Sequence, residues 1–191
     1  MVGNFPNFTK LDVLKCFLKF GKKISRNELS KELGLGEGTV RTILNILKEK
    51  NLLDSTKKGH FLNNRGMEVL NAIGKDMEGP KKAKTEKNFP HSKIVAILLR
   101  KGNEIKNAYK LRDLAVKEKA EGALILRFNN KLHAPESEYD KDFDELENLF
   151  AFKNGDFLVV AFADNEKHAE SGALAVAAEL NDELKSFLNQ F

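Results

Sequence analysis

Residues 25–60 read SRNELSKELGLGEGTVRTILNILKEKNLLDSTKKGH, and this stretch decides the fold of the N-terminal part of the chain. Ser25 is followed three residues later by Glu28, which is the spacing of a capping box, so a helix is predicted to begin at Arg26. Gly34 and Gly36 then predict a tight turn, because glycine adopts backbone conformations that end a helix.

A second helix is predicted from about Gly38 to Lys50. Its apolar residues recur at i, i+3, i+4 and i+7, which places on one face Val40, Ile43, Leu44 and Leu47. The opposite face carries short polar and basic side chains, namely Thr39, Arg41, Thr42, Asn45 and Lys48. A helix-turn-helix that reads the major groove of DNA has this layout. An amphipathic helical hairpin with a solvated outer face has it too, so that alternative stays open.

The residues after this helix predict a short hairpin with a basic tip, formed by residues 52–56, Lys57-Lys58-Gly59 and residues 60–62. The whole segment resembles the winged helix-turn-helix domain of prokaryotic transcriptional regulators, with residues 37–53 similar to the recognition helix and first wing strand. The resemblance implies that the tip lies along the phosphate backbone or the minor groove. We therefore expect Thr39, Arg41, Thr42 and Asn45 to read bases. The side chains expected to contact the phosphate backbone of DNA are those of Lys48, Lys57, Lys58 and His60.

Composition excludes several classes of protein. The chain has 191 residues, of which 41% are hydrophobic and 31% charged, as in ordinary globular proteins. No apolar run has the length of a membrane span, and the N-terminus lacks the apolar core of a signal peptide. The single cysteine, Cys16, excludes an intramolecular disulfide, and the four histidines are too scattered to suggest a metal site. We expect a cytoplasmic protein without a structural metal.

Charge divides the chain into three segments. Residues 1–76 carry 14 lysines and arginines against 8 acidic residues, a net charge of +6 that suits a domain binding phosphate. Residues 77–92 are polar and contain two prolines, which predicts an interdomain linker. Residues 93–191 carry 14 basic against 18 acidic residues, a net charge of −4, and form the second predicted domain.

Two helices are predicted around the quoted stretch in the first domain, over 10–20 and 67–75. The helix over 67–75 is predicted either to cover the core of the domain or to form a dimer contact. In the second domain, the apolar run 94–99, a helix over 104–119 and a strand over 122–128 predict a β-α-β unit with a parallel strand pair.

The remaining elements predicted are a short strand over 131–134, an acidic loop over 136–144, a hairpin over 149–162 and a long helix over 165–187. The predicted fold is thus α+β: an N-terminal winged helix-turn-helix domain followed by a C-terminal α/β domain with a mixed sheet and a long C-terminal helix.

The second domain shows no catalytic signature. It contains no phosphate-binding glycine loop, nucleophile elbow or zinc-protease motif, so we expect neither an enzyme nor a cofactor. The acidic residues at 136–147 lack the alternating spacing of a calcium loop.

The second domain is predicted either to bind an effector or to mediate oligomerisation, and the ligand that we predict is a small anionic effector. Loops after the strands of α/β folds collect small ligands, and the candidates in such a loop and the helix after it are Lys101, Asn103, Asn107 and Lys110. The alternative that they are ordinary helix-surface and loop residues remains open.

As a whole, the chain resembles an archaeal family of uncharacterised winged-helix regulators. The N-terminal half of that family is similar to the DNA-binding domain of the central glycolytic genes regulator, and its C-terminal half is a domain of unknown function. The resemblance implies transcriptional regulation through double-stranded DNA. We expect a homodimer, since one recognition helix reads only a few base pairs. The apolar residues Phe187, Leu188 and Phe191 are a candidate dimer contact. A protein–protein interaction module built on the winged helix is the alternative.

Overall fold

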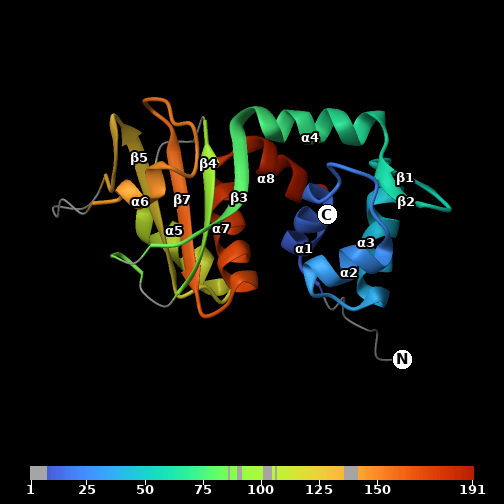
Figure 1. The fold of residues 1–191 in the computed structure, drawn as a ribbon. Coiled ribbons are helices and arrows are strands. Elements are labelled where there is room, and N and C mark those ends of the chain that lie inside the picture. The colour runs from blue at the N-terminus through green and yellow to red at the C-terminus, as the bar shows by residue number, and fades with distance from the viewer. Residues whose placement is uncertain (1–7, 86, 90–91, 101–104, 106, 136–141) are drawn as a thin grey trace. The chain divides into compact units, whose positions relative to one another are not determined.

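The computed structural model describes residues 8–85, 87–89, 92–100, 105, 107–135 and 142–191. The chain divides into two compact units, whose elements are labelled in Figure 1. The first unit comprises Met1–Ala72 with Phe187–Phe191, and the second comprises Ile73–Ser186. The second unit thus includes the residues of the predicted linker, 77–92.

The first unit contains three helices and a hairpin, followed by a further helix that continues into the second unit. These elements are α1 (Lys10–Leu18), α2 (Arg26–Leu33), α3 (Glu37–Glu49), β1 (Leu53–Thr56), β2 (Gly59–Leu62) and α4 (Asn64–Asp76). The predicted capping box begins α2, where the Glu28 N–H donates to the Ser25 hydroxyl at 3.2 Å and the Ser25 N–H donates to the Glu28 carboxylate at 3.0 Å. Thr9 and Asp12 form a second capping box at α1, which the sequence predictions missed.

The inner face of α3 lies in the core of the first unit. The four residues that the periodicity places on this face are all at most 2% exposed: Val40, Ile43, Leu44 and Leu47. Gly34 ends α2 in the left-handed conformation, with φ of 60°, and so permits the predicted turn. The hairpin is fastened to the segment before α2, because Ile24 and His60 exchange two backbone hydrogen bonds of 3.0 and 2.9 Å.

The C-terminal phenylalanines pack within the first unit. The Phe187 side chain is 1% exposed, and its ring centroid lies 4.7 Å from that of Phe17 on α1. Phe191 lies beside Phe187, with centroids 5.1 Å apart. The prediction that Phe187 offers a dimer contact is therefore wrong, because its apolar surface is already used in a core.

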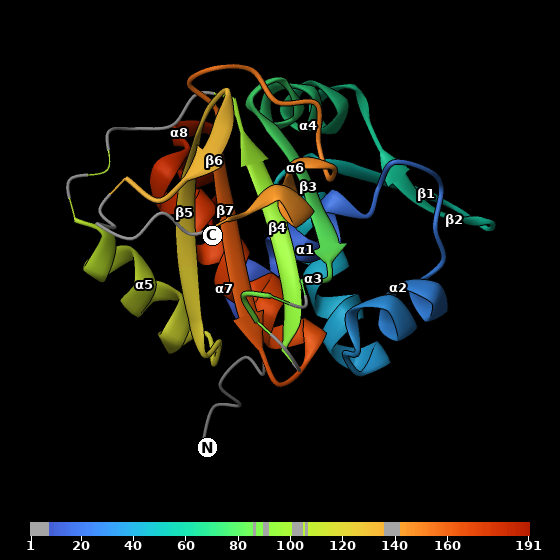
Figure 2. The same cartoon turned by 60° about the vertical axis from the view of Figure 1, so that its left-hand side comes forward.

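A five-stranded sheet forms the second unit, with the strand order β3-β4-β7-β5-β6 and every neighbouring pair antiparallel (Figure 2). The strands are β3 (Met77–Ala83), β4 (Lys93–Leu99), β5 (Gly122–Asn129), β6 (Lys131–His133) and β7 (Phe157–Ala163). The helices are α5 (Ala108–Lys117), α6 (Asp144–Glu147), α7 (Glu166–Leu180) and α8 (Asp182–Leu188). Helix α7 covers one face of the sheet, and α6 lies against the other.

The predicted parallel pair, and with it the mixed sheet, is wrong. β4 and β5 both pair antiparallel with β7, which lies between them, so they run in the same direction without sharing hydrogen bonds. The even-numbered residues of β4 belong to the core on the α6 side, whereas the odd-numbered residues face the other way, toward α7. The continuous apolar run 94–99 therefore reflects burial on both faces rather than parallel pairing.

The predicted linker 77–92 differs from the structure over Met77–Ala83, which form the edge strand β3. Its pairing with β4 shifts register between Glu78 and Lys81, around a cis Gly79-Pro80 bond. Lysines, a proline and a bulge are the features that protect an exposed sheet edge from unwanted pairing. They also lower the hydrophobicity of the segment, which is why it resembles a linker.

Two further predictions in this unit need correction. Residues 149–152 form no strand; instead the Phe152 ring stacks on Phe128 at 5.0 Å, and Phe150 joins the core on the α6 side. The long C-terminal helix is broken at Asn181, whose extended backbone separates α7 from α8 and whose side chain accepts from the Leu184 N–H at 3.0 Å. Helix α7 packs closely against its neighbours, since a Cβ at Gly172 would lie 2.7 Å from the Ala120 Cβ.

Candidate nucleic-acid interface

The outer face of α3 presents the side chains that were predicted to read bases. Arg41, Thr42 and Asn45 are exposed, and Thr39 is half-buried. The Thr42 hydroxyl donates to the Gly38 carbonyl one turn earlier, at 3.2 Å. The opposite face of the same helix is anchored in the core, so these four side chains are displayed on a fixed support.

Polar contacts hold α3 against its two neighbours within the unit. At its N-terminus, Glu37 pairs with Arg26 of α2 at 3.0 Å and accepts from the Asn27 amide at 3.4 Å. Near its C-terminus, the Lys48 ammonium donates to the Ser55 hydroxyl of β1 at 2.9 Å. These contacts join α3 to α2 and to the first strand of the hairpin.

The hairpin tip is basic and exposed, as predicted. Lys57 and Lys58 lie between β1 and β2, and neither side chain forms an ion pair with another described residue. Lys23 also reaches the hairpin: its ammonium lies 5.0 Å from the centre of the Phe61 ring and 3.5 Å from the Thr56 hydroxyl. The sequence predictions missed Lys23, although its position beside Lys22 just before the capped helix was an available signal.

His60 differs from the other predicted phosphate contacts. Its side chain is half-buried in the hairpin, and its Nδ1 atom has no hydrogen-bond partner among the described residues. Burial lowers the pKa of this imidazole, and the charges of Lys48 and Arg26 lower the pKa further. His60 is therefore neutral at physiological pH and adds no positive charge to the surface.

Several acidic side chains of the first unit are engaged with close partners. Asp12 and Glu28 close the two capping boxes, Glu37 pairs with Arg26, and Glu32 lies 3.9 Å from the Lys19 ammonium. Hydrogen bonds from Ser25 lower the pKa of Glu28, which keeps it ionised in its cap. In contrast, Arg41, like the two tip lysines, forms no ion pair with a described residue. The uncompensated positive charge therefore includes α3 and the hairpin tip.

Only two of the four predicted effector residues, Asn107 and Lys110, belong to the part of the chain that the structure describes. Lys101 and Asn103 lie outside the described residues. The Asn107 side chain accepts from the Lys110 N–H at 3.1 Å and so serves as the N-cap of α5. The Lys110 side chain is exposed on that helix.

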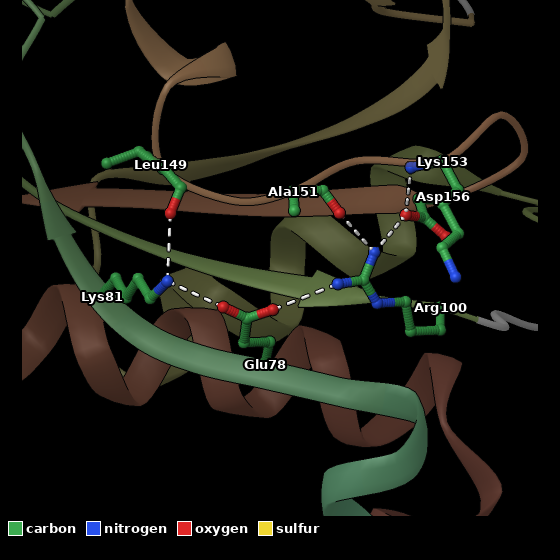
Figure 3. A network of polar contacts seen from close by, with 7 residues as sticks. All are labelled: Glu78, Lys81, Arg100, Leu149, Ala151, Lys153 and Asp156. Atoms are coloured by element: carbon green, nitrogen blue, oxygen red, sulfur yellow. Dashed lines mark hydrogen bonds and ion pairs between the residues drawn. The ribbon is translucent and has the colours of Figure 1, made fainter.

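A network of polar contacts lies where β4 ends (Figure 3). The Arg100 guanidinium donates to Asp156 and to the Ala151 carbonyl, both at 2.7 Å, and to Glu78 at 3.1 Å. Lys81 donates to the other oxygen of Glu78 at 2.8 Å, and this bond is the main cause of the lowered pKa of Glu78. The charged groups are satisfied by one another, so the network fastens β3 and the loop before β7 to β4.

Among the described residues, no group of three histidine, cysteine or acidic side chains is arranged to hold a metal ion. None of the helices in the described part of the chain has the length and apolar character needed to cross a bilayer. Burial raises the pKa of the Cys16 thiol to about 12, which keeps it protonated and unreactive.

Two sequence-family models match parts of the chain. Residues 10–68 match the N-terminal domain of PH0730-like proteins, and residues 91–180 match a domain of unknown function, DUF4443. Among solved structures, the chain is similar to hypothetical protein PH0730 from Pyrococcus horikoshii OT3, with a TM-score of 0.78 and 26% sequence identity over 95% of this chain and 100% of that chain. No curated protein matches the chain. The chain is thus similar over most of its length to an archaeal protein whose name states no activity.

Proposed function

We propose that the first unit is a winged helix-turn-helix domain and that the protein is a DNA-binding transcriptional regulator. The observation that carries this proposal is the combination, within one unit, of the exposed face of α3 with a basic hairpin tip. The contact between Lys48 and Ser55 joins the two elements at 2.9 Å. In this arrangement the helix enters the major groove and reads the sequence, while the hairpin contacts the adjacent phosphate backbone and adds affinity.

The side chains divide into two roles in this proposal. Arg41 suits a guanine, through a bidentate bond to O6 and N7, and Asn45 suits an adenine. Thr39 and Thr42 offer hydroxyl and methyl groups to neighbouring bases. Lys48, Lys57 and Lys58 neutralise phosphates, while the neutral His60 donates or accepts a hydrogen bond without adding to the salt dependence.

A homodimer is part of the proposal, because two recognition helices on a two-fold operator give the specificity that one helix lacks. The second unit then mediates assembly or senses a small molecule, and regulation takes place in the cytoplasm where the DNA is accessible. The net charge of −4 on residues 93–191, which make up most of the second unit, supports this division, since an acidic segment is unsuited to phosphate contacts.

Selection of bound genomic fragments by the wild-type protein, followed by affinity measurements on the enriched duplex, tests the proposal. Arg41→Ala should lose about 1–3 kcal/mol of discrimination at one base-pair position. Lys110→Ala, an exposed charge on α5, is the matched control and should bind as the wild type does. Failure to enrich any sequence, together with no binding at low salt, would refute the proposal and favour a protein-interaction module.

Gly38 supplies a sharper test, because stability and DNA binding should move in opposite directions. A Cβ at this position meets no atom within 4 Å, so neither packing nor a left-handed backbone requires glycine there. Alanine should therefore stabilise α3 by about 0.5–1 kcal/mol. Since the Gly38 carbonyl lies beside the Thr42 hydroxyl on the outer face, the added methyl group should also hinder the approach of DNA and weaken binding. Higher stability with unchanged DNA affinity would show that this face does not approach the duplex.

A further inference from the structure

A small apolar cavity lies within the second unit, between α5 and the outer edge of β5. Its volume is about 240 Å³, which is room for about eight water-sized groups. Most of its lining is aliphatic and includes Ala123, Ile125 and Ala134, with Tyr109 and Arg112 contributed by α5. Figure 2 shows α5 beside β5 at this margin of the sheet.

One wall of the cavity is a strand edge that has no neighbouring strand among the described residues. β6 pairs with β5 only over Arg127–Asn129, whereas β7 pairs with it from Gly122 onward. The Phe128 N–H donates to the Asp156 carbonyl at 2.8 Å, so the even-numbered peptide groups of β5 point toward β7. The odd-numbered groups of Ala123 and Ile125 therefore point outward, and no other described strand pairs with them.

Two polar side chains of α5 border this apolar space. Arg112 is exposed and forms no ion pair with a described residue, although acidic side chains are common in this unit. Tyr109 is 76% exposed, which is unusual for a large aromatic side chain and leaves its ring and hydroxyl available. Tyrosine and arginine are among the residue types most often found at the hot spots of protein interfaces.

We propose that this cavity binds a small organic carboxylate with an apolar body. The aliphatic lining takes the body, the Arg112 guanidinium pairs with the carboxylate, and the outward peptide groups of Ala123 and Ile125 supply further hydrogen bonds. An apolar pocket with a few convergent polar groups is the usual form of a small-ligand site. Arg112, which has no ion-pair partner among the described residues, favours an anion over a neutral ligand, because a charged hydrogen bond is stronger than a neutral one.

This site differs from the effector site predicted from the sequence. Lys110 lies two residues from Arg112 but does not line the cavity, and Asn107 is occupied as a helix cap. A role of the bound carboxylate in regulation would rest on the proposed function of the protein. Binding itself does not, since it involves only the second unit.

The test is to titrate the full chain with ligand in the absence of DNA. Binding is measured by calorimetry and by changes in the NMR chemical shifts of isotope-labelled protein. The probes are 3-methylbutanoate and benzoate, with the corresponding amides as neutral controls of the same shape. We expect roughly millimolar or tighter binding of the carboxylates and at least about tenfold weaker binding of the amides. The chemical-shift changes should be confined to the residues that line the cavity.

Variants make the result specific to the cavity. Arg112→Gln should weaken carboxylate binding about tenfold or more, and Ala134→Leu, which fills the space, should weaken carboxylates and amides alike. Lys110→Gln removes an equal charge nearby and should bind as the wild type does. No saturable binding by the wild type, equal affinity for acid and amide, or equal losses in Arg112→Gln and Lys110→Gln would overturn the proposal. Each outcome is read without DNA, so it stays separate from failure of the DNA-binding proposal.

Discussion

The hairpin tip gives a quantitative test of how the protein would bind DNA. Truncating Lys57 and Lys58 together to alanine removes two exposed charges and disturbs no side-chain contact. The backbone N–H of Lys58, which donates to the Thr56 hydroxyl at 3.2 Å, is kept. We therefore expect the free energy of unfolding to change by less than about 0.5 kcal/mol.

The magnitude follows from counterion release. Each phosphate contact contributes about 0.9 to the slope of log affinity against log salt concentration, so losing two contacts should make the slope shallower by about 1.8 per protomer. Between 50 and 200 mM salt, the wild type should then lose about twelvefold more affinity than the variant. If two protomers bind one duplex, the slope should differ by about 3.6.

Fluorescence anisotropy with a labelled duplex across a salt series measures this slope directly. The charge-matched control is Lys110→Ala with Lys117→Ala, which removes two exposed lysines from α5. Its slope should equal that of the wild type. Equal slopes for the tip variant and the wild type would refute the placement of the tip on the phosphate backbone, and an equal reduction in the control would indicate binding through overall charge alone.

Three further predictions concern stability and reactivity. Gly66→Ala should lower the free energy of unfolding by more than about 2 kcal/mol, because the new methyl group would collide with the Leu52 carbonyl; urea denaturation measures the change. Arg100→Met should cost about 3–5 kcal/mol in the same assay, since it leaves the Asp156 carboxylate, only 5% exposed, without its charged partner. Cys16, with its pKa raised to about 12, should react with a thiol reagent at pH 8 only when the protein unfolds, so its labelling rate should follow denaturant concentration.

Matched substitutions distinguish these effects from general fragility. Gly74→Ala lies on the same helix as Gly66 but meets no atom within 4 Å, so it should stabilise rather than destabilise. Lys185→Ala breaks an ion pair with Glu179 in which both side chains are about half exposed, and it should cost less than about 1 kcal/mol. If Arg100→Met cost no more than Lys185→Ala, the polar network at the end of β4 would have no structural role.

The sequence was most informative where structure depends on neighbouring residues. The capping box at Ser25, the turn at Gly34 and the inner face of α3 were all predicted, because each depends on spacings of one to seven residues. The exposed polar face and the basic hairpin tip were predicted for the same reason. Lys23 was missed, since its place beside Phe61 depends on how the segment before α2 pairs with the hairpin.

In the second unit, the local sequence patterns predict the strands β4 and β5 but not which strands pair with each other. The apolar runs of β4 and β5 predicted strands, yet the strand between them, β7, comes from residues about sixty positions after β4. Nothing in the runs themselves states which strand neighbours which, because a strand buried on both faces has the same composition in a parallel or an antiparallel sheet. Residues 77–83 were predicted as part of a linker, because an edge strand and a linker are both polar.

By itself, the sequence determined the helices and the hairpin of the first unit, the charge difference between the two parts of the chain, and the absence of known catalytic motifs. These properties depend on short-range order and composition. Only the tertiary structure decided the strand order, the capture of Arg100 between two carboxylates and the unpaired edge of β5 beside Arg112. They depend on pairing between distant segments, which is selected by the packing of the whole unit rather than by any one stretch.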